Sequence, residues 1–377
     1  MGHMPSDLSS PLAELAQQAA SSYRAKPTDQ PVMSPAFLRL LTHVLHQASL
    51  QAGRQVAAAE VLSAGMRSVV VRVTWAGPAL PAPRGRTAVL KYFRRRDSAT
   101  NSGGFGYLRE KHGLPALAEL MPGLYPQLLT ADDEHRLLIL EDVSGSPSPV
   151  SLGDLMLSTG ADATPHQALT AWADTWASIL SSPAQATTQA SFSAELARAD
   201  ARASAPGSLP SPQLAFKGLH LLAERQGVAV GSAEFAHMER AVASIIYPAP
   251  SERVLSSGDF SPANLLVTLP TPPPGAGAGP SLPLPVRGID AEGTCLHHWA
   301  LPLAEMLLGF PSWPEGPLPP ATAQSPSWRG VAQELYRRIC PTPQADMDAD
   351  PRLAAAYLTI RAILAEQTAG QGPQAHP

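Results

Sequence analysis

The chain has 377 residues, 44% of them hydrophobic, and a formal net charge of −4. This length allows one large domain or two lobes around a sizeable core, and no run of 18 apolar residues predicts a membrane span. Two cysteines without metal-ligand spacing exclude a disulfide framework, and the acidic balance argues against a nucleic-acid partner. No secretory signal opens the chain, so we expect a cytoplasmic protein.

The first part of the chain predicts a small, strand-rich lobe over residues 34–143. Residues 1–33 are polar and rich in Ala, Ser and Pro, so we expect a flexible N-terminal tail with a short helix near Leu12–Tyr23. Ser34 is a candidate N-cap for a helix that follows it. Further on, the pattern predicts strands at Val69–Trp75, Thr87–Phe93 and Arg136–Val143, and a helix over 105–120.

The remaining residues, 144–370, predict a larger and mainly helical lobe. Apolar residues recur at helical spacing within 163–182, 211–227, 231–247, 301–308, 328–339 and 352–366. Two short strand-like runs, Asn264–Thr268 and Pro285–Asp290, interrupt the helices. The segment that joins them, 269–284, is rich in Pro and Gly, so we expect a mobile hairpin insertion.

Charge divides unevenly along the chain. Residues 1–143 carry a balance of +3, and residues 144–377 carry −7. A positive half that faces a nucleotide and a negative half that attracts a cationic substrate would produce this division. Chance placement of surface charge explains it equally well.

The stretch VLSSGDFSPANLLV, residues 254–267, contains one of only two asparagines in the chain. Phosphoryl transfer needs a carboxylate that orients the attacking hydroxyl and, five residues later, a neutral oxygen ligand for Mg²⁺. Asp259 and Asn264 have that spacing. A turn in which both side chains bond their own backbone is an equally good interpretation of this stretch alone.

A second acidic motif, VRGIDAEG, places Asp290 at the end of a strand-like run. If the two runs form a hairpin, Asn264 opens the first strand and Asp290 closes the second, so both lie at the same end. Such a pair would complete a Mg²⁺ site. The alternative is an aspartate that serves only the turn, which is common at strand ends.

The small lobe adds a lysine in an apolar strand, TAVLKYF, and a glutamate in the predicted helix, YLREKHG. Lys91 must find an anion or lose free energy by burial, and Glu110 offers a partner. A Lys–Glu pair that holds ATP phosphates is the arrangement used by protein kinases. Alternatively, Lys91 extends to solvent from an edge strand and Glu110 is a solvated helix residue.

Taken in order, these motifs resemble the aminoglycoside phosphotransferase/choline kinase family over roughly residues 60–310. The resemblance implies an α+β, bilobal, protein-kinase-like fold, with a small antiparallel-sheet N-lobe holding one helix and a larger mainly helical C-lobe. It implies that Asp259 is catalytic and that Asn264 and Asp290 hold Mg²⁺. The nucleotide contacts that it implies are Lys91 with Glu110, the loop that contains Gly65 and Ser68, and the segment Leu140, Glu141 and Asp142.

Two residues depart from the family's pattern. Ser257 stands where the family usually has a histidine before Gly-Asp, and Pro302 stands where it commonly has an aspartate. Both positions support the site rather than touch the reactants, so the resemblance implies reduced or altered activity rather than none. Pro302 suits the first turn of a helix.

These observations predict an ATP- and Mg²⁺-dependent kinase of a small hydroxyl compound, such as an aminoglycoside, an amino alcohol or a sugar. A nucleotide-binding pseudokinase is the alternative that Ser257 and Pro302 motivate. A protein kinase is disfavoured, because the chain has no H-R-D, D-F-G or A-P-E motif. The adjacent His297 and His298 have no metal-ligand spacing, and Trp172 and Trp176, four residues apart on a helix, predict core packing.

Overall fold

The computed structural model describes residues 11–24, 31–79, 81, 85–94, 105–144, 149–158, 164–203, 211–268, 284–311, 318, 322 and 325–370. The chain divides into two compact units, which are treated separately below. Unit 1 comprises Met1–Pro115 and Pro126–Gly145, and unit 2 comprises Ala116–Tyr125 and Ser146–Pro377. Within the described residues, no helix combines the length and the apolar character that crossing a bilayer requires.

Unit 1 is built on a five-stranded antiparallel sheet with the order β1-β2-β3-β5-β4. Its strands are β1 (Val56–Ala64), β2 (Ser68–Trp75), β3 (Thr87–Phe93), β4 (Leu128–Asp132) and β5 (Leu137–Glu141). Its helices are α1 (Pro11–Ser22), α2 (Pro35–Ala52) and the first part of α3 (Gly106–Leu120), which lies between β3 and β4 in sequence. The predicted antiparallel sheet with a helix inserted in it is therefore confirmed.

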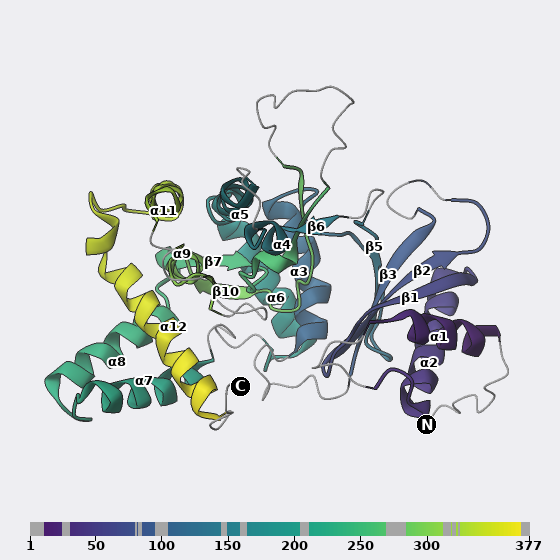
Figure 1. The fold of residues 1–377 in the computed structure, drawn as a ribbon, viewed down its shortest axis with the longest axis horizontal. Coiled ribbons are helices and arrows are strands. Elements are labelled where there is room, and N and C mark those ends of the chain that lie inside the picture. Colours follow the sequence, from purple (N-terminus) through teal and green to yellow (C-terminus); the bar gives the residue numbers. More distant parts are fainter. Residues whose placement is uncertain are drawn as a thin grey trace. The chain divides into compact units, whose positions relative to one another are not determined.

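The alternating pattern of β2 fixes which face of the sheet is covered. Val69, Val71 and Val73 are fully buried, whereas the residues between them are half-buried. These valines belong to one apolar cluster with residues of α1 and α2, which lie beside the sheet in Figure 1. Because successive side chains in a strand point to opposite faces, the other face of the sheet is left for α3.

The N-terminal helix α1 packs into this core. Ala16, Ala19 and Ala20 are buried in the cluster shared with α2 and the sheet. Residues 11–22 thus form the predicted short helix. The expectation of a flexible tail is wrong for this part, because the helix packs into the core of unit 1. Ser34 caps α2 as expected, since its side chain accepts a hydrogen bond from the Phe37 amide at 3.2 Å.

Strands β1 and β4 escaped the sequence analysis. The β1 sequence, VAAAEVLSA, is rich in alanine, which favours helix in isolation. Pairing along nearly the whole length of β2 overrides that preference, with Val61 opposite Val71 and Glu60 opposite Arg72.

Unit 2 is mainly helical, as predicted. Its helices are the end of α3, α4 (Leu152–Met156), α5 (Thr164–Leu180), α6 (Gln185–Ala199), α7 (Pro212–Gln226), α8 (Ala233–Ile246), α9 (Ala300–Leu307), α11 (Pro326–Ile339) and α12 (Pro351–Gly370). The long α12, yellow in Figure 1, crosses α7 and α8 and shares an apolar cluster with them. Helix α6 was missed from the sequence, because its apolar residues are few.

Short strands carry the rest of unit 2. They are β6 (Val150–Ser151), β7 (Arg253–Ser256), β8 (Leu265–Val267), β9 (Val286–Gly288) and β10 (Cys295–His298). Strand β8 lies between β6 and β9, and β7 pairs with β10. The sequence analysis found β8 and β9 but not β7 and β10, since four residues are too few to show a period of two. Most of the insertion expected at 269–284 lies outside the described residues.

The crossing of α7 and α12 generates a stability prediction. A Cβ atom added at Gly218 would overlap the backbone carbonyl of Ala362, so the two helices approach each other there at backbone contact. We expect Gly218→Ala to lower the free energy of unfolding by about 1–3 kcal/mol, because the helices must separate. Urea unfolding followed by circular dichroism measures the change.

The matched control is Gly330→Ala in α11, an exposed helical glycine with no atom within 4 Å of its added Cβ. Alanine there should raise stability by about 0.5–1 kcal/mol, as helix propensity predicts. Equal effects of the two substitutions would contradict the close crossing.

Candidate functional site

Two antiparallel strand pairs in unit 2 hold two segments face to face. Strand β7 pairs with β10, with Ser256 opposite Cys295, and β8 pairs with β9, with Leu265 opposite Gly288. The segment 257–264 leaves β7 and enters β8, while the segment 289–294 leaves β9 and enters β10. The two segments are therefore anchored at both ends to the same neighbours, and the Ile289 amide donates to the Asn264 carbonyl at 2.8 Å.

Asp259 and Asn264 lie in the first of these segments and contact each other. The Asn264 side chain hydrogen-bonds the Asp259 carboxylate, and the Ser261 amide donates to Asp259 Oδ1 at 2.9 Å. The local turn that the sequence left open as an alternative is thus present for Asp259, whereas the Asn264 side chain bonds Asp259. It also joins the two predicted functional residues, so the turn and the candidate site are one structure.

Asp259 is exposed by its surface area, yet protein atoms lie closely around its carboxylate. The displacement of water by these atoms raises the pKa of Asp259 above its usual value, and the charges of Asp290 and Glu292 raise it further. Hydrogen bonds from Ser261 and Asn264 act in the opposite direction. The effect of Asp290 and Glu292 on this pKa indicates that the second segment brings its carboxylates near Asp259.

Asp290 lies two residues after the end of β9, at the end of the β8–β9 pair where Asn264 lies, as the hairpin argument predicted. Its backbone φ is +60°, in the left-handed region that residues other than glycine adopt infrequently. A carboxylate oxygen of Asp290 lies within 4.8 Å of one of Glu292. The segment therefore gathers negative charge despite the electrostatic cost.

Glycines permit the two segments to approach. A Cβ on Gly293 would lie 2.8 Å from the Ser257 carbonyl oxygen, so a side chain at Gly293 would push the segments apart. Gly258 has a φ of +74°, which turns the chain between Ser257 and Asp259. The glycines of the motifs GDFSPAN and IDAEG thus serve the close contact between them.

Ser257 and Pro302, the two positions that depart from the pattern of the resemblance, both lie in well-defined surroundings. The Ser257 side chain hydrogen-bonds the hydroxyl of Tyr125, whose pKa is raised by burial and by the charges of Asp259 and Asp290. The Tyr125 ring lies directly over Gly288, where an added Cβ would come within 2.6 Å of it. Pro302 occupies the first turn of α9 and is buried. Tyr125 was missed from the sequence, because nothing in its own segment marks it.

The oxygen-rich donors in unit 2 fit a hard divalent cation. Asn264 offers an amide oxygen, and Asp290 and Glu292 offer carboxylates, which are the ligand types that Mg²⁺ prefers. No described histidine or cysteine belongs to this group. The accumulated negative charge beside Asp259 is the feature that a bound cation would relieve.

In unit 1, Lys91 and Glu110 form a buried ion pair, with Nζ 2.6 Å from Oε2 and side-chain exposures of only 6% and 1%. Lys91 lies in the middle of β3, opposite Val70 of β2 and Leu138 of β5, so it is not on an edge strand. It lies on the sheet face away from α2, because its neighbour Leu90 belongs to the α2 cluster. The predicted pairing is thus observed, and its role with phosphate stays a prediction.

Gly65 and Ser68 lie at the two ends of the short β1–β2 connection. Gly65 follows β1, and Ser68 begins β2 opposite Phe93. Between them Met66 is exposed. A single glycine in a three-residue connection leaves backbone amides near its tip, and their contact with phosphate stays a prediction.

The predicted adenine segment begins in β5. Leu140 is buried, and Glu141 exchanges contacts with Gln127, whose amide donates to the Glu141 carboxylate at 3.1 Å. The Asp142 carboxylate lies 3.2 Å from Arg72 Nε and accepts the Ser144 amide at 3.0 Å, and the pKa of Asp142 is lowered by these partners. The described contacts of the Asp142 side chain thus anchor the end of the sheet, and only backbone groups remain as candidates for adenine.

No protein-family model and no curated protein matches the sequence. The chain is similar to the solved structure of Plasmodium vivax ethanolamine kinase, at 13% identity over 99% of this chain and 97% of that one, with a TM-score of 0.47. It is also similar to a macrolide 2′-phosphotransferase from Brachybacterium faecium, at 16% identity over 89% and 99%, TM-score 0.43. A choline kinase from Streptococcus pneumoniae matches at 15% identity over 88% and 90%, TM-score 0.43.

The buried pair in unit 1 generates a prediction about stability. We expect Lys91→Met alone to destabilise unit 1 by about 3–5 kcal/mol, because it leaves the Glu110 carboxylate buried without its cation. The double variant Lys91→Met/Glu110→Leu should recover most of that loss, since it removes both charges of the pair. Urea unfolding of the parent, both single variants and the double variant gives the coupling free energy. A double variant that loses the sum of both single effects would contradict this account.

Proposed function

We propose that this chain is an ATP- and Mg²⁺-dependent phosphotransferase that moves the γ-phosphoryl group of ATP to a hydroxyl of a small molecule. One observation carries the proposal: the paired segments of unit 2 bring Asp259, Asn264 and Asp290 together. This combines a carboxylate for the attacking hydroxyl with oxygen ligands for a cation, which is the constellation that phosphoryl transfer requires.

Asn264 and Asp290 would hold the Mg²⁺. When bound, the ion would neutralise negative charge on the ATP phosphates. An amide at Asn264 suits this position, because it ligates a hard cation without adding negative charge. Asn264 now donates its amide N–H to Asp259, so its carbonyl oxygen stays available as an acceptor.

Asp259 would serve as the acceptor for the proton of the substrate hydroxyl. The substrate oxygen forms a bond to the γ-phosphorus, the bond between that phosphorus and the β–γ bridging oxygen breaks, and ADP leaves with the electron pair. The hydroxyl proton passes to the Asp259 carboxylate. Its raised pKa supports this role, since it makes the carboxylate a better proton acceptor than an ordinary aspartate.

Unit 1 would supply nucleotide contacts. Lys91, fixed by Glu110, would contact ATP phosphates, backbone amides between Gly65 and Ser68 would cover them, and backbone groups of Leu140–Asp142 would meet the adenine. The negative balance of residues 144–377 favours a cationic acceptor, such as an amino alcohol or an aminoglycoside.

The test separates binding from transfer. We expect ATP with Mg²⁺ to raise the melting temperature of the parent, because a ligand that binds only the folded state stabilises it. Asp290→Asn should abolish the magnesium-dependent part of this rise. Asp259→Asn should keep the rise but lower transfer of ³²P from [γ-³²P]ATP to a panel of hydroxyl compounds by at least about 10³-fold.

Asp200→Asn is the matched control, since Asp200 is bonded to Arg202 in a surface turn and touches none of these residues. It should change neither binding nor transfer. Magnesium-dependent binding without transfer to any acceptor would favour the pseudokinase alternative. No stabilisation by millimolar ATP and Mg²⁺ would refute both.

A further inference from the structure

His297 was set aside in the sequence analysis, yet it lies beside the candidate catalytic segment. It sits on β10, opposite Val254 of β7, and only 1% of its surface is exposed. Burial lowers the pKa of His297 to about 4, so the ring is neutral at pH 7. None of the roles proposed above uses it.

The hydrogen bonds of His297 fix which nitrogen carries the proton. Nδ1 lies 3.0 Å from the His298 carbonyl oxygen, and a carbonyl can only accept, so Nδ1 carries the hydrogen. Nε2 is therefore an acceptor, and it lies 2.6 Å from Ser256 Oγ. The Ser256 hydroxyl donates to His297, and its oxygen accepts the Gly258 amide at 3.1 Å. A directed chain of hydrogen bonds thus runs from His297 to the residue before Asp259.

The same imidazole also contacts the residue after Asp259. The His297 and Phe260 rings pack edge to face with centroids 5.1 Å apart. Phe260 packs in turn against Trp176 of α5 at 5.0 Å, and its carbonyl accepts the Trp172 indole N–H at 3.0 Å. Asp259 is consequently bracketed by two neighbours, Gly258 and Phe260, that both depend on His297.

We propose that His297 is a positioning residue that sets the place of the Asp259 carboxylate through Ser256 and Phe260. The inference rests on the proposed role of Asp259 in phosphoryl transfer. It deepens that role by naming a residue, outside both motifs, that aligns it. A misplacement of about 1 Å in such a carboxylate costs on the order of 10²-fold in rate.

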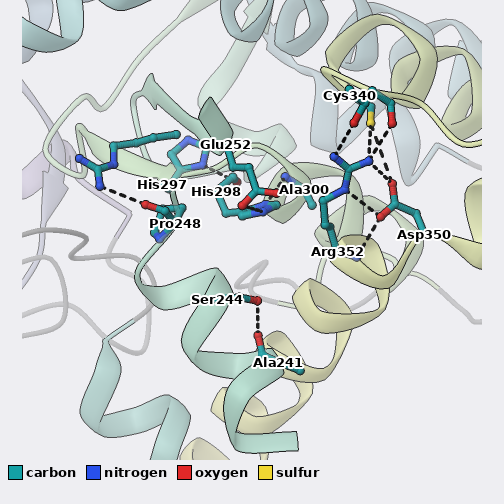
Figure 2. A network of polar contacts seen from close by, with 12 residues as sticks. Ala241, Ser244, Pro248, Glu252, His297, His298, Ala300, Cys340, Asp350 and Arg352 are labelled. Atoms are coloured by element: carbon teal, nitrogen blue, oxygen red, sulfur yellow. Dashed lines mark hydrogen bonds and ion pairs between the residues drawn. The ribbon is translucent and has the colours of Figure 1, made fainter. Parts of the chain in front are cut away.

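The adjacent histidine provides the control. His298 is equally buried, but its Nδ1 accepts the Ala300 amide at 3.1 Å and its Nε2 lies 3.6 Å from Glu252. Figure 2 shows this arrangement, with His298 between Glu252 and Ala300. His298 therefore supports the entry into α9, and its side chain has no described contact with residues 256–260.

The experiment compares His297→Leu, His297→Gln, Ser256→Ala and His298→Gln at a temperature where circular dichroism shows all of them folded. We expect His297→Leu and Ser256→Ala each to lower kcat about 10- to 100-fold, with KM for ATP within about twofold of the parent. His297→Gln should keep more of kcat than His297→Leu does, since the glutamine amide oxygen can accept a hydrogen bond from Ser256. His298→Gln should keep kcat within about twofold.

The double variant Ser256→Ala/His297→Leu should lose little more than either single variant, because both break one chain of contacts. A parallel measurement is hydrogen exchange of the Gly258 amide, which needs no substrate. It should accelerate in Ser256→Ala and His297→Leu and stay unchanged in His298→Gln.

The inference is overturned if His297→Leu keeps the parental kcat, if His298→Gln loses as much, or if Gly258 exchange does not respond. Should His297→Leu fail to fold, Ser256→Ala tests the inference instead, because it breaks the same series of hydrogen bonds by removing a single hydroxyl oxygen. A parent without phosphoryl transfer would refute the proposed function. The hydrogen-exchange data would then still decide whether His297 fixes the position of residues 256–260.

Discussion

The candidate site depends on one constraint, the pairing of four very short strands in unit 2. Ser256 opposite Cys295 and Leu265 opposite Gly288 define the ends of two facing segments. Neither segment has regular structure long enough to hold itself, so the strand pairs hold both, and α5 also contacts the first segment at Phe260. Loops that carry functional residues on a rigid frame are a general solution in enzymes.

Backbone strain and negative charge are concentrated in the two facing segments of unit 2. Asp290 adopts a left-handed backbone, and the pKa of Asp259 is raised by desolvation and by the charges of Asp290 and Glu292. Such features lower stability unless a ligand compensates them, and they concentrate at functional sites. The Lys91–Glu110 pair in unit 1 is a further feature of this kind. A buried ion pair often adds little net stability, so stability alone does not explain it.

The sequence was sufficient to predict strands β8 and β9, which follow and precede the candidate residues, but not strands β7 and β10. The order of the two strands predicted that Asn264 and Asp290 lie at one end of a hairpin. In an antiparallel pair, the start of the first strand lies beside the end of the second. The supporting residues were out of reach. Tyr125 is 132 residues from Ser257 in sequence, and the contact between them exists only in the folded chain. The separate contacts of His297 and His298 were also out of reach, because they depend on which strand lies beside β10.

The most direct test of the account is an experimental structure with Mg²⁺ and a non-hydrolysable ATP analogue. We predict that the metal lies about 2.1 Å from an Asn264 amide oxygen and an Asp290 carboxylate oxygen, with the terminal phosphate facing Asp259. We also predict that His297 keeps its contact with Ser256. A metal and phosphates held elsewhere, with Asn264 and Asp290 free of both, would contradict the central claim.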